Sequence, residues 1–369
     1  MSDELRIGTR GSQLALWQAN TVAARIAAAG GPPCRIMVIS TSGDRLQDAP
    51  LWQVGGKRLF VKEIEDALLR NDIDLAVHSS KDMPAILPDG LVIAGVLPRE
   101  DPRDAVVLPV MTDGLGLMAN GSGLMADKTE IHQPYAISHQ PSAMTSRAQP
   151  SAMTTIDDLV AALGQTPSIG TGSVRRIAQL TRLFPGAQFK AIRGNLDTRL
   201  RKLDEGGHDA LVLAAAGLRR LGFADRISYA LPAAACVPAP GQGIVAVEIR
   251  GDDGRTLAFV SRLDDPAAGA ALAAERALVE ALGGGCQTPV GALATLIDDD
   301  TIELVAAVIA LDGSRAVRER GVGPRSDAAA LGAQVGAALL AQGADLILAE
   351  AVSQQAQAAS HRSAAMTDD

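Results

Sequence analysis

Apolar residues along the first hundred positions alternate between short continuous runs and longer stretches with helical spacing. The runs at 5–8, 34–40 and 73–78 are typical of buried strands, and residues 13–29 carry the spacing of an amphipathic helix. A polar loop that contains Arg10 joins the first strand to this helix. Strands that alternate with helices predict an α/β fold with a parallel sheet, in which ligands bind at the carboxyl ends of the strands.

The same order of elements returns after residue 155. The sequence Ile169-Gly-Thr-Gly-Ser echoes Ile7-Gly-Thr-Arg-Gly-Ser, and both join a short strand to a helix. A second echo sets Asp74-Leu-Ala-Val-His against Asp209-Ala-Leu-Val-Leu, each after a helical stretch. Free N–H groups at the start of a helix bind anions. We therefore expect two lobes of similar plan, each with an anion-binding loop at a shared cleft, which resembles the fold of type II periplasmic binding proteins.

The last third of the chain shows a different pattern. The run at 244–249 predicts a strand that returns to the first lobe, and 264–281 predicts a helix. Three further strands and a helix are expected at 290–294, 301–310, 315–321 and 326–341. These elements indicate a small C-terminal α+β domain. The expected fold class is therefore α/β, with two similar lobes and this third domain.

Breaks in the pattern set the expected domain boundaries. Prolines and charges interrupt the chain at 98–104, and a second hinge-like run lies at 238–243. Residues 110–154 contain a near-repeat and weak periodicity, which is typical of an inserted, poorly ordered loop. The expected divisions are domain 1 at 1–98 and 242–261, domain 2 at 99–237 with the insert at 110–154, domain 3 at 264–353, and a flexible tail at 354–369.

Composition narrows the class of protein. The 369 residues carry a net charge of -8 and only 2% aromatic residues, which argues against a general nucleic-acid-binding protein. No long apolar run follows the acidic first residues, so we expect neither a signal peptide nor a membrane span. The three cysteines lie far apart and fit neither a disulfide framework nor a CxxC metal site. We expect a cytoplasmic monomer without metal, membrane or nucleic-acid partners.

Basic residues concentrate in the second lobe. Residues 168–226 hold eleven basic and five acidic side chains, although the whole chain is negatively charged. Nine of the eleven are arginines, whose planar guanidinium groups bind carboxylates and phosphates through paired hydrogen bonds. We expect this region to attract a small polyanion. We expect Arg182, Arg201 and Arg226, by contrast, to lie on solvated helix faces.

Two short loops offer chemistry beyond anion binding. Lys81 and Asp82 follow a buried strand, so Asp82 is a candidate working carboxylate, although an aspartate shortly before a proline also suits a turn. Cys286 lies between three glycines and a proline. An accessible thiolate is a strong nucleophile. The second loop is therefore either a covalent attachment point or a tight turn with an incidental cysteine.

Eleven short motifs are spread along the chain outside the expected insert and tail. They are Arg6-Ile-Gly-Thr-Arg-Gly-Ser, Leu14-Ala-Leu-Trp-Gln-Ala, Val54-Gly-Gly-Lys, Leu59-Phe-Val-Lys-Glu, Ala76-Val-His-Ser-Ser-Lys-Asp-Met-Pro, Arg99-Glu-Asp-Pro-Arg-Asp-Ala, Gly172-Ser-Val-Arg-Arg, Ile192-Arg-Gly-Asn-Leu-Asp-Thr-Arg-Leu, Ala215-Ala-Gly-Leu-Arg-Arg-Leu, Pro240-Gly-Gln-Gly and Gly284-Gly-Cys-Gln-Thr-Pro-Val-Gly. Together, and in this order, they resemble the porphobilinogen deaminase family, also called hydroxymethylbilane synthase.

The resemblance implies a specific activity. Family members hold a dipyrromethane cofactor through a thioether to the cysteine that matches Cys286. They add porphobilinogen units one at a time, with loss of ammonia, until four are joined, and then release linear hydroxymethylbilane by hydrolysis. The expected function is therefore that of a transferase of tetrapyrrole (haem) biosynthesis. Because each ring carries an acetate and a propionate, the resemblance also explains a cleft rich in arginine.

The resemblance assigns residues to three roles. The catalytic set is Asp82, Lys81 and Arg10, with Asp82 expected to protonate the leaving amine and to stabilise cationic intermediates. The cofactor-binding set is Cys286, Asp82, Ser79, Lys57, Thr171, Ser173, Arg175, Arg176 and Arg193. The substrate-binding set is Arg10, Arg199, Arg220, Ser12 and Phe60. Gln53 and Gly172 depart from residues usual in the family, and we expect each to weaken at most one carboxylate contact.

Two other classes of function fit parts of the sequence. A cytosolic two-lobed protein that binds or senses small anions would use the same lobes, but it has no use for Cys286 or for Asp82 beside Lys81. An RNA-binding protein would use the basic stretch, but the scarcity of aromatic residues and the overall charge argue against it.

Overall fold

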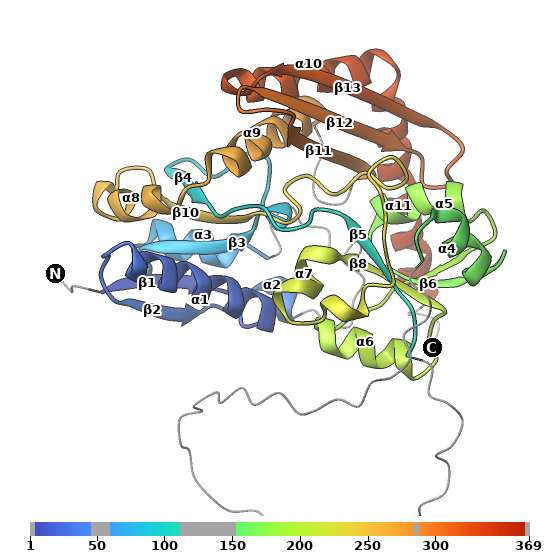
Figure 1. Cartoon of the computed structure of the whole chain (residues 1–369), viewed down its shortest axis with the longest axis horizontal. Helices are drawn as coiled ribbons and strands as arrows, with labels where there is room; N and C mark the ends of the chain where they lie inside the picture. Colours follow the sequence, from blue (N-terminus) through green and yellow to red (C-terminus); the bar gives the residue numbers. More distant parts are fainter. Residues whose placement is uncertain (1–3, 46–59, 111–152, 284–287, 366–369) are drawn as a thin grey trace, which may run out of the picture.

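The structure is a computed structural model, and it describes residues 4–45, 60–110, 153–283 and 288–365. Cys286, Lys57 and Gln53 lie outside these residues, and so do positions 111–152 of the expected insert. The described residues form three sheets, and Figure 1 shows the third of them at the top, in orange and red.

The first sheet has five strands, in the order β2 (Cys34–Val38), β1 (Leu5–Thr9), β3 (Leu75–Ser79), β10 (Val245–Arg250) and β4 (Leu91–Val96). β1 runs parallel to β2 and β3, whereas β10 runs antiparallel to β3 and β4. Leu5 and Ile7 of β1 belong to one buried core with the apolar face of α1 (Gln13–Ala28). The predicted return of the chain to this sheet is confirmed, whereas β4 is not among the expected strands.

The second sheet also has five strands, in the order β7 (Gln188–Lys190), β6 (Ser168–Gly170), β8 (Ala210–Ala214), β5 (Asp104–Val107) and β9 (Tyr229–Ala230). β6 runs parallel to β7 and β8, and β5 runs antiparallel to β8 and β9. The helices of this lobe are α4 (Ile156–Leu163), α5 (Val174–Leu183), α6 (Leu196–Asp204) and α7 (Ala215–Arg220). α4 begins where the order of elements was expected to return, directly after residue 155.

The two sheets share one plan. In each, the second strand, β1 or β6, has two parallel neighbours. The next strand along, β10 or β5, comes from another part of the chain and runs antiparallel to them. The chain passes from the first sheet to the second through a crossover at 97–103 and returns through one at 231–244. The loops that follow β1 and β6 therefore occupy equivalent positions. This topology confirms the expected pair of similar lobes.

The third sheet is antiparallel, in the order β11 (Val290–Leu296), β12 (Thr301–Ile309) and β13 (Ala316–Pro324). Its helices are α9 (Pro266–Ala281), α10 (Ala328–Ala341) and α11 (Ala344–Ala365). A Cβ on Gly332 would lie 2.1 Å from the carbonyl oxygen of Ala274, so the close crossing of α10 and α9 requires glycine there. The tail expected from residue 354 is helical to Ala365, since its many alanines favour a helix.

The remaining short helices are α2 (Ser42–Arg45), α3 (Lys62–Leu69), α8 (Gly254–Val260), η1 (Ser80–Asp82), η2 (Ala224–Arg226), η3 (Ser261–Leu263) and η4 (Arg325–Asp327). Among the described residues, no single helix is long and apolar enough to cross a membrane. One pair of helices, Arg325–Ala341 and Ala344–Gln354, meets that length and composition test together but is bent by 79°. The domain boundaries given above stay a prediction.

Both crossovers meet the third sheet at the buried carboxylate of Glu275, on α9. Arg99, in the outgoing crossover, donates from Nη1 to Glu275 Oε1 at 2.6 Å. The backbone N–H of Gly241, in the returning crossover, donates to Oε2 at 2.5 Å, and that of Ala294, on β11, donates to Oε1 at 2.8 Å. One side chain thus fixes the position of both crossovers against the third sheet.

Candidate active site

The loops after β1 and β3 bring polar side chains to one edge of the first sheet. Ser12 caps α1 by accepting a hydrogen bond from the N–H of Ala15 at 3.3 Å, which fixes the loop that carries Arg10. η1 continues directly from β3 and carries Lys81 and Asp82. Because β1 and β3 are neighbours and parallel, Arg10 and Asp82 line the same cavity. The sequence-based placement of Asp82 at the end of a strand is confirmed.

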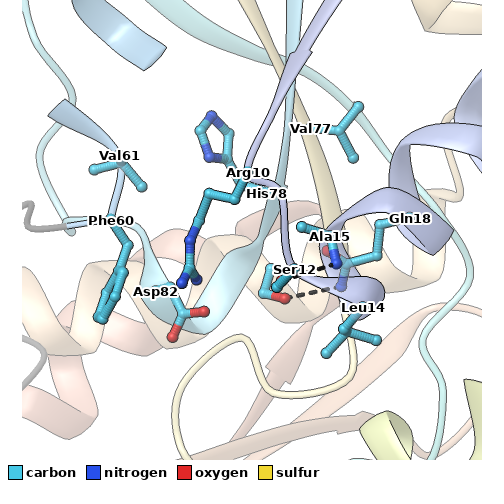
Figure 2. Close-up of a pocket in the computed structure, with 11 residues that line it drawn as sticks. Arg10, Ser12, Leu14, Ala15, Gln18, Phe60, Val61, Val77, His78 and Asp82 are labelled. Carbon is cyan, nitrogen blue, oxygen red and sulfur yellow. Dashed lines mark hydrogen bonds between the residues drawn. The ribbon is translucent and has the colours of Figure 1, made fainter. Parts of the chain in front are cut away.

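Figure 2 shows this cavity, whose remaining walls come from α1 and from the residues before α3. Its lining residues are Arg10, Ser12, Leu14, Ala15, Gln18, Phe60, Val61, Val77, His78, Ser79 and Asp82. Gln18 Nε2 donates to Ser79 Oγ at 2.8 Å and so orients that hydroxyl. The cavity combines a carboxylate and a guanidinium group with apolar walls, and charges interact more strongly in such surroundings than in water.

Arg10 already has a partner within the protein. Its Nη2 lies 2.5 Å from Asp44 Oδ1, and its guanidinium carbon lies 4.2 Å from the centre of the Phe60 ring. Burial alone raises the pKa of Asp44, but hydrogen bonds from Arg10 and Thr41 lower it by more, so the carboxyl is held ionised. A ligand carboxylate at Arg10 therefore has to share the guanidinium group with Asp44.

Lys81 contacts the returning crossover. Its Nζ donates to Gln242 Oε1 at 3.3 Å. Burial lowers the pKa of Lys81 to about 8, against the opposing effect of the Asp82 charge. The lysine next to the candidate catalytic carboxylate thus titrates much closer to neutral pH than an exposed lysine does.

Arg175 and Arg176 lie in the first turn of α5, and both are buried against Asp104 at the start of β5. Arg175 Nη1 lies 2.7 Å from Asp104 Oδ2, and Arg176 Nε lies 2.9 Å from Oδ1. Each arginine also donates to a backbone carbonyl, of Val237 and Val212 respectively. Burial alone raises the pKa of Asp104, but the two guanidinium groups hold it well below its usual range. These arginines have an anionic partner inside the protein, and their expected contact with a cofactor stays a prediction.

Arg199, on α6, lies in a different electrostatic environment. Its Nε donates to the carbonyl oxygen of Gly194 at 2.9 Å. Burial, together with the positive charges of Arg176 and Arg193, lowers the pKa of Arg199 to about 10. Among the described residues, the charges that act on this guanidinium group therefore have its own sign. An anionic ligand would stabilise such a cluster.

Thr171 and Ser173 lie in the loop between β6 and α5, which is the counterpart of the loop with Arg10. Thr171 is buried, and its Oγ1 accepts a hydrogen bond from the N–H of Ser173 at 3.3 Å. Ser173 is the N-cap residue of α5, and its side chain makes no capping bond. The structure thus brings Thr171 and Ser173 to the carboxyl end of β6, where the sequence predicts a binding loop.

Arg220, expected to bind substrate, joins the two lobes. From α7 of the second lobe its Nη2 donates to the carbonyl oxygen of Gly243 at 2.6 Å, just before β10 of the first sheet. Its guanidinium carbon lies 5.5 Å from the centre of the Trp17 ring on α1. Arg220 is not among the residues that line the cavity of Figure 2, and its role toward substrate stays a prediction.

Of the three arginines expected on solvated helix faces, Arg201 is confirmed, since its side chain is exposed and pairs with an acidic residue one turn further on. The expectation is wrong for Arg226, whose side chain is 22% exposed and pairs with Asp204 at 2.7 Å. Arg182 is exposed but also donates to the carbonyl oxygen of Gly313 at 2.7 Å, which connects α5 to the loop before β13.

Sequence reasoning missed Asp44, Asp104 and Gln242, which hold the cationic residues in place. Sequence patterns do not reveal such pairs, because the fold brings distant residues together; Arg175 and Asp104, for example, are 71 residues apart. One signal was present: Asp104 opens an apolar strand, and a charged residue is rarely fully buried unless it is paired.

The two cysteines in the described part of the chain differ in burial. Cys34 is half-buried and Cys236 is buried, and both are free thiols. Burial raises the pKa of Cys236 to about 12, with a further contribution from Asp104, so its reactive thiolate is disfavoured. Within the same residues, no group of three or more His, Cys, Asp or Glu side chains has an arrangement that could hold a metal ion.

Two family models match the chain. The first, described as "Porphobilinogen deaminase, dipyromethane cofactor binding domain", matches residues 5–124 and 133–258. The second, described as "Porphobilinogen deaminase, C-terminal domain", matches residues 270–341. The first match runs into the expected insert and omits 125–132 of it. Positions 110–124 and 133–154 of the expected insert therefore also match the family model.

Proteins of known name and known structure are also similar to the chain. The porphobilinogen deaminase of Syntrophobacter fumaroxidans is 41% identical over 347 residues, which are 94% of this chain and 97% of that protein. That of Brevibacillus brevis is 40% identical over 353 residues, 95% of this chain and 99% of that protein. The solved periplasmic VFT2 domain of Bordetella pertussis BvgS is 13% identical, with a TM-score of 0.36, and the match covers 71% of this chain and 86% of that domain.

Proposed function

The chain belongs to the porphobilinogen deaminase family, and we propose that it joins four porphobilinogen units one at a time and releases linear hydroxymethylbilane. It is an enzyme of tetrapyrrole biosynthesis, a transferase that polymerises pyrroles. The observation that carries the residue-level proposal is the shared cavity of Asp82 and Arg10, at the carboxyl ends of two neighbouring parallel strands. A cytoplasmic location and a monomeric state stay predictions.

The residues around the site fit a dipyrromethane cofactor, whose rings carry carboxylates. Arg199 lies among charges of its own sign, and Ser80 Oγ is buried without a hydrogen-bond partner among the described residues. We propose that Arg193, Thr171 and Ser173 hold the cofactor carboxylates from the second lobe. When bound, the dipyrromethane supplies the free pyrrole carbon to which the first unit is joined.

The attachment point we propose is Cys286, through a thioether. Cys286 lies outside the described residues, so this assignment rests on the family and on the chemistry of the other two thiols. Cys236 is buried with its pKa raised to about 12, and burial also raises the pKa of Cys34. Both effects disfavour the thiolate that forms such a bond.

Asp82 acts on the reacting end of the substrate. In its protonated form it gives a proton to the leaving amine of porphobilinogen as the carbon–nitrogen bond breaks, and the electron pair of that bond leaves with ammonia. The Asp82 carboxylate then stabilises the cation left on the substrate, and the apolar walls of the cavity strengthen this attraction. The proton released when the new carbon–carbon bond forms returns to Asp82.

Arg10 orients the substrate. Its Nε and Nη2 donate to Asp44, while Nη1 donates to no acceptor among the described residues. Nη1 therefore remains for a substrate carboxylate, and the Phe60 ring, against which the guanidinium group lies, limits how that group turns. A guanidinium group with a fixed direction holds the carboxylate, and hence the aminomethyl carbon, in one position relative to Asp82.

Replacement of Asp82 tests this proposal. The purified protein should consume porphobilinogen and yield a linear tetrapyrrole, and Asp82→Asn should lower kcat by about 10²–10⁴-fold. Asp89→Asn, at an exposed position in the loop before β4, should leave kcat unchanged. Near-normal turnover in Asp82→Asn would remove this residue from the mechanism, and binding of porphobilinogen by the parent protein without consumption would favour an anion-binding protein.

The intact mass of the protein tests the attachment. The parent protein should exceed its sequence mass by one dipyrrole, and Cys286→Ala should show the sequence mass alone. Cys34→Ala is the matched control and should keep the added mass. An adduct mapped to Cys34 or Cys236 by peptide digestion would contradict the assignment.

A further inference from the structure

Gln242, in the returning crossover, uses every polar atom of its side chain within the protein. The residue is 1% exposed. Its Nε2 donates to the carbonyl oxygen of Pro102 at 2.7 Å and to Asp104 Oδ1 at 3.0 Å, and its Oε1 accepts from Lys81 Nζ at 3.3 Å. This one side chain therefore contacts the loop of Asp82, the outgoing crossover and the first residue of β5.

The direction of the Gln242 amide follows from these partners. The carbonyl oxygen of Pro102 can only accept a hydrogen bond, and the Asp104 carboxylate, whose pKa is held low by two arginines, also accepts. The amide must turn its NH₂ toward both of them. Its oxygen is then left facing Lys81, whose ammonium group can only donate.

The backbone at Gln242 is held as firmly as the side chain. Its carbonyl oxygen accepts from Arg99 Nε at 2.9 Å. Gly241 and Gly243 on either side have φ values of 73° and 88°, and a Cβ on Gly243 would lie 2.3 Å from the carbonyl oxygen of Glu100. The flanking glycines thus let the crossover run close to the outgoing one, and Gln242 has little freedom to move away from Lys81.

The Lys81 ammonium group lies among charges of both signs. The charged groups that act on it are Asp82 on η1, Asp104 on β5, and Arg175 and Arg176 on α5. Burial lowers the pKa of Lys81 to about 8, so its protonated form depends on the acceptors around it. The Gln242 oxygen is one such acceptor, and a hydrogen bond to the charged form of a group favours that form.

We propose that Gln242 is a positioning residue, which holds the Lys81 ammonium group beside Asp82 and couples the catalytic loop of the first sheet to the Asp104 cluster of the second. Its effect on turnover rests on the proposed function and is exerted through Lys81. Two hydrogen bonds in series, Lys81 to Gln242 and Gln242 to Asp104, connect the two sheets at this point.

Gln179 offers a matched control. It is 3% exposed, its Nε2 donates to the carbonyl oxygen of Val237 at 3.0 Å, and its Oε1 accepts from the N–H of Val237 at 2.7 Å. It is therefore a buried glutamine that clamps the same crossover, but its recorded hydrogen bonds reach neither Lys81 nor Asp104. Loss of either amide should destabilise the crossover, so a purely structural role would give the two variants the same behaviour.

The experiment compares Gln242→Met with Gln179→Met, in full-length protein. Titration of lysine Cε by ¹³C NMR, without substrate, reports the pKa of Lys81, which Lys81→Met assigns. We expect Gln242→Met to lower this pKa by about one pH unit, which is the effect of one hydrogen bond to a charged group. We expect kcat to fall by about ten- to a hundredfold with KM within about threefold, as for a misplaced catalytic group. Gln179→Met should lower Tm but change neither the pKa of Lys81 nor kcat.

A second variant, Gln242→Glu, should shift the pKa of Lys81 in the opposite direction. It keeps an acceptor oxygen toward Lys81 and adds a negative charge, so the pKa of Lys81 should rise, while the donor to Asp104 is lost. Movement of the pKa in opposite directions in the two variants cannot come from a shared loss of stability. An unchanged Lys81 titration in both variants, or an equal change in Gln179→Met, would overturn the proposal. Because the titration needs no substrate, a parent protein that fails to consume porphobilinogen would contradict only the proposed function.

Discussion

The arginines of this protein divide by the acceptor that each guanidinium group already contacts. Arg175 and Arg176 share the buried Asp104, and burial without that carboxylate would leave two charges in a poorly solvating environment. Among the described residues Arg199 has no such carboxylate partner, and the charges of Arg176 and Arg193 repel it. We therefore expect the same residue type to serve the fold in one place and a ligand in another.

This division predicts opposite outcomes for two variants. Arg176→Met leaves Asp104 with one guanidinium partner and the carbonyl of Val212 without its donor, so the free energy of unfolding should fall by about 3–5 kcal/mol. Arg199→Met removes a repelled charge and should leave stability within about 0.5 kcal/mol or slightly raised, while KM for porphobilinogen rises. Urea unfolding measures the free energy of unfolding of both variants, and steady-state kinetics measures their KM. Equal losses of stability in the two variants would contradict this account of the cluster.

The lowered pKa of Lys81 predicts that this residue favours activity at a cost in stability, and that the cost depends on pH. Its pKa is about 8 in the folded protein and about 10.4 in an unfolded chain, so below pH 8 the folded state holds a charge that burial disfavours by about 3 kcal/mol. Lys81→Met should therefore be more stable than the parent at pH 7, by about 1–2 kcal/mol after loss of the bond to Gln242. It should be inactive.

The stability difference between Lys81→Met and the parent should shrink as pH rises from 8 toward 10, because the unfolded chain then binds more protons at this position than the folded one. Urea unfolding at pH 7, 8.5 and 9.5 measures it. Lys62→Met, at an exposed position on α3, is the control and should show no such trend. A Lys81 variant that is less stable than the parent at pH 7 would contradict the direction of this shift.

At the scale of elements, sequence patterns predicted the strands and helices whose formation depends on nearby residues. The strand at 73–78 and the placement of Asp82 after it follow from an apolar run that ends in polar residues, and α4 follows from helical spacing with the capping residue Thr155. β4 was not predicted, although Leu91–Val96 is a continuous apolar run like the one that predicted β10. What local patterns do not carry is which strands become neighbours, because β4 and β10 pair although they lie about 150 residues apart along the chain.

The packing of α10 on α9 predicts a sharp effect of one methyl group. A Cβ on Gly332 would lie 2.1 Å from the carbonyl oxygen of Ala274, so Gly332→Ala should force the helices apart and lower the free energy of unfolding by about 1–3 kcal/mol. Gly254→Ala, at the exposed start of α8 with no atom within 4 Å of the added Cβ, should change it by less than about 0.5 kcal/mol. Thermal unfolding compares the two. A tolerated Gly332→Ala would mean that this crossing is looser than described.

At the scale of the whole molecule, the contacts that join the sheets are concentrated on the two crossovers. Glu275 ties Arg99 and Gly241 to the third sheet, and Gln242 connects the loop of Asp82 to Asp104. Candidate catalytic residues come from the first lobe, and candidate carboxylate-binding residues come from both lobes, such as Arg10 in the first and Arg199 in the second. The position of each lobe relative to the other is therefore part of the site.

Arg220 is the contact between the lobes that is easiest to remove, because it reaches from α7 to Gly243 and Trp17 of the first lobe without a carboxylate partner among its recorded hydrogen bonds. One hydrogen bond from a charged donor and one cation–π contact together should contribute about 2–3 kcal/mol to the closed arrangement. In Arg220→Met we expect the lobes to separate more often, which small-angle scattering of the substrate-free protein measures as a larger radius of gyration.

Loss of this contact should also raise KM for porphobilinogen, since the parts of the site on the two lobes are then less often correctly placed relative to each other. The effect on kcat should be smaller. Arg219→Met is the matched control, because the neighbouring arginine is 42% exposed and pairs with Asp101 at the surface, where such pairs contribute little. It should leave both the scattering and KM as in the parent. If Arg220→Met raises KM but leaves the radius of gyration unchanged, Arg220 binds substrate directly, as its sequence motif first suggested, and the contact between the lobes is secondary.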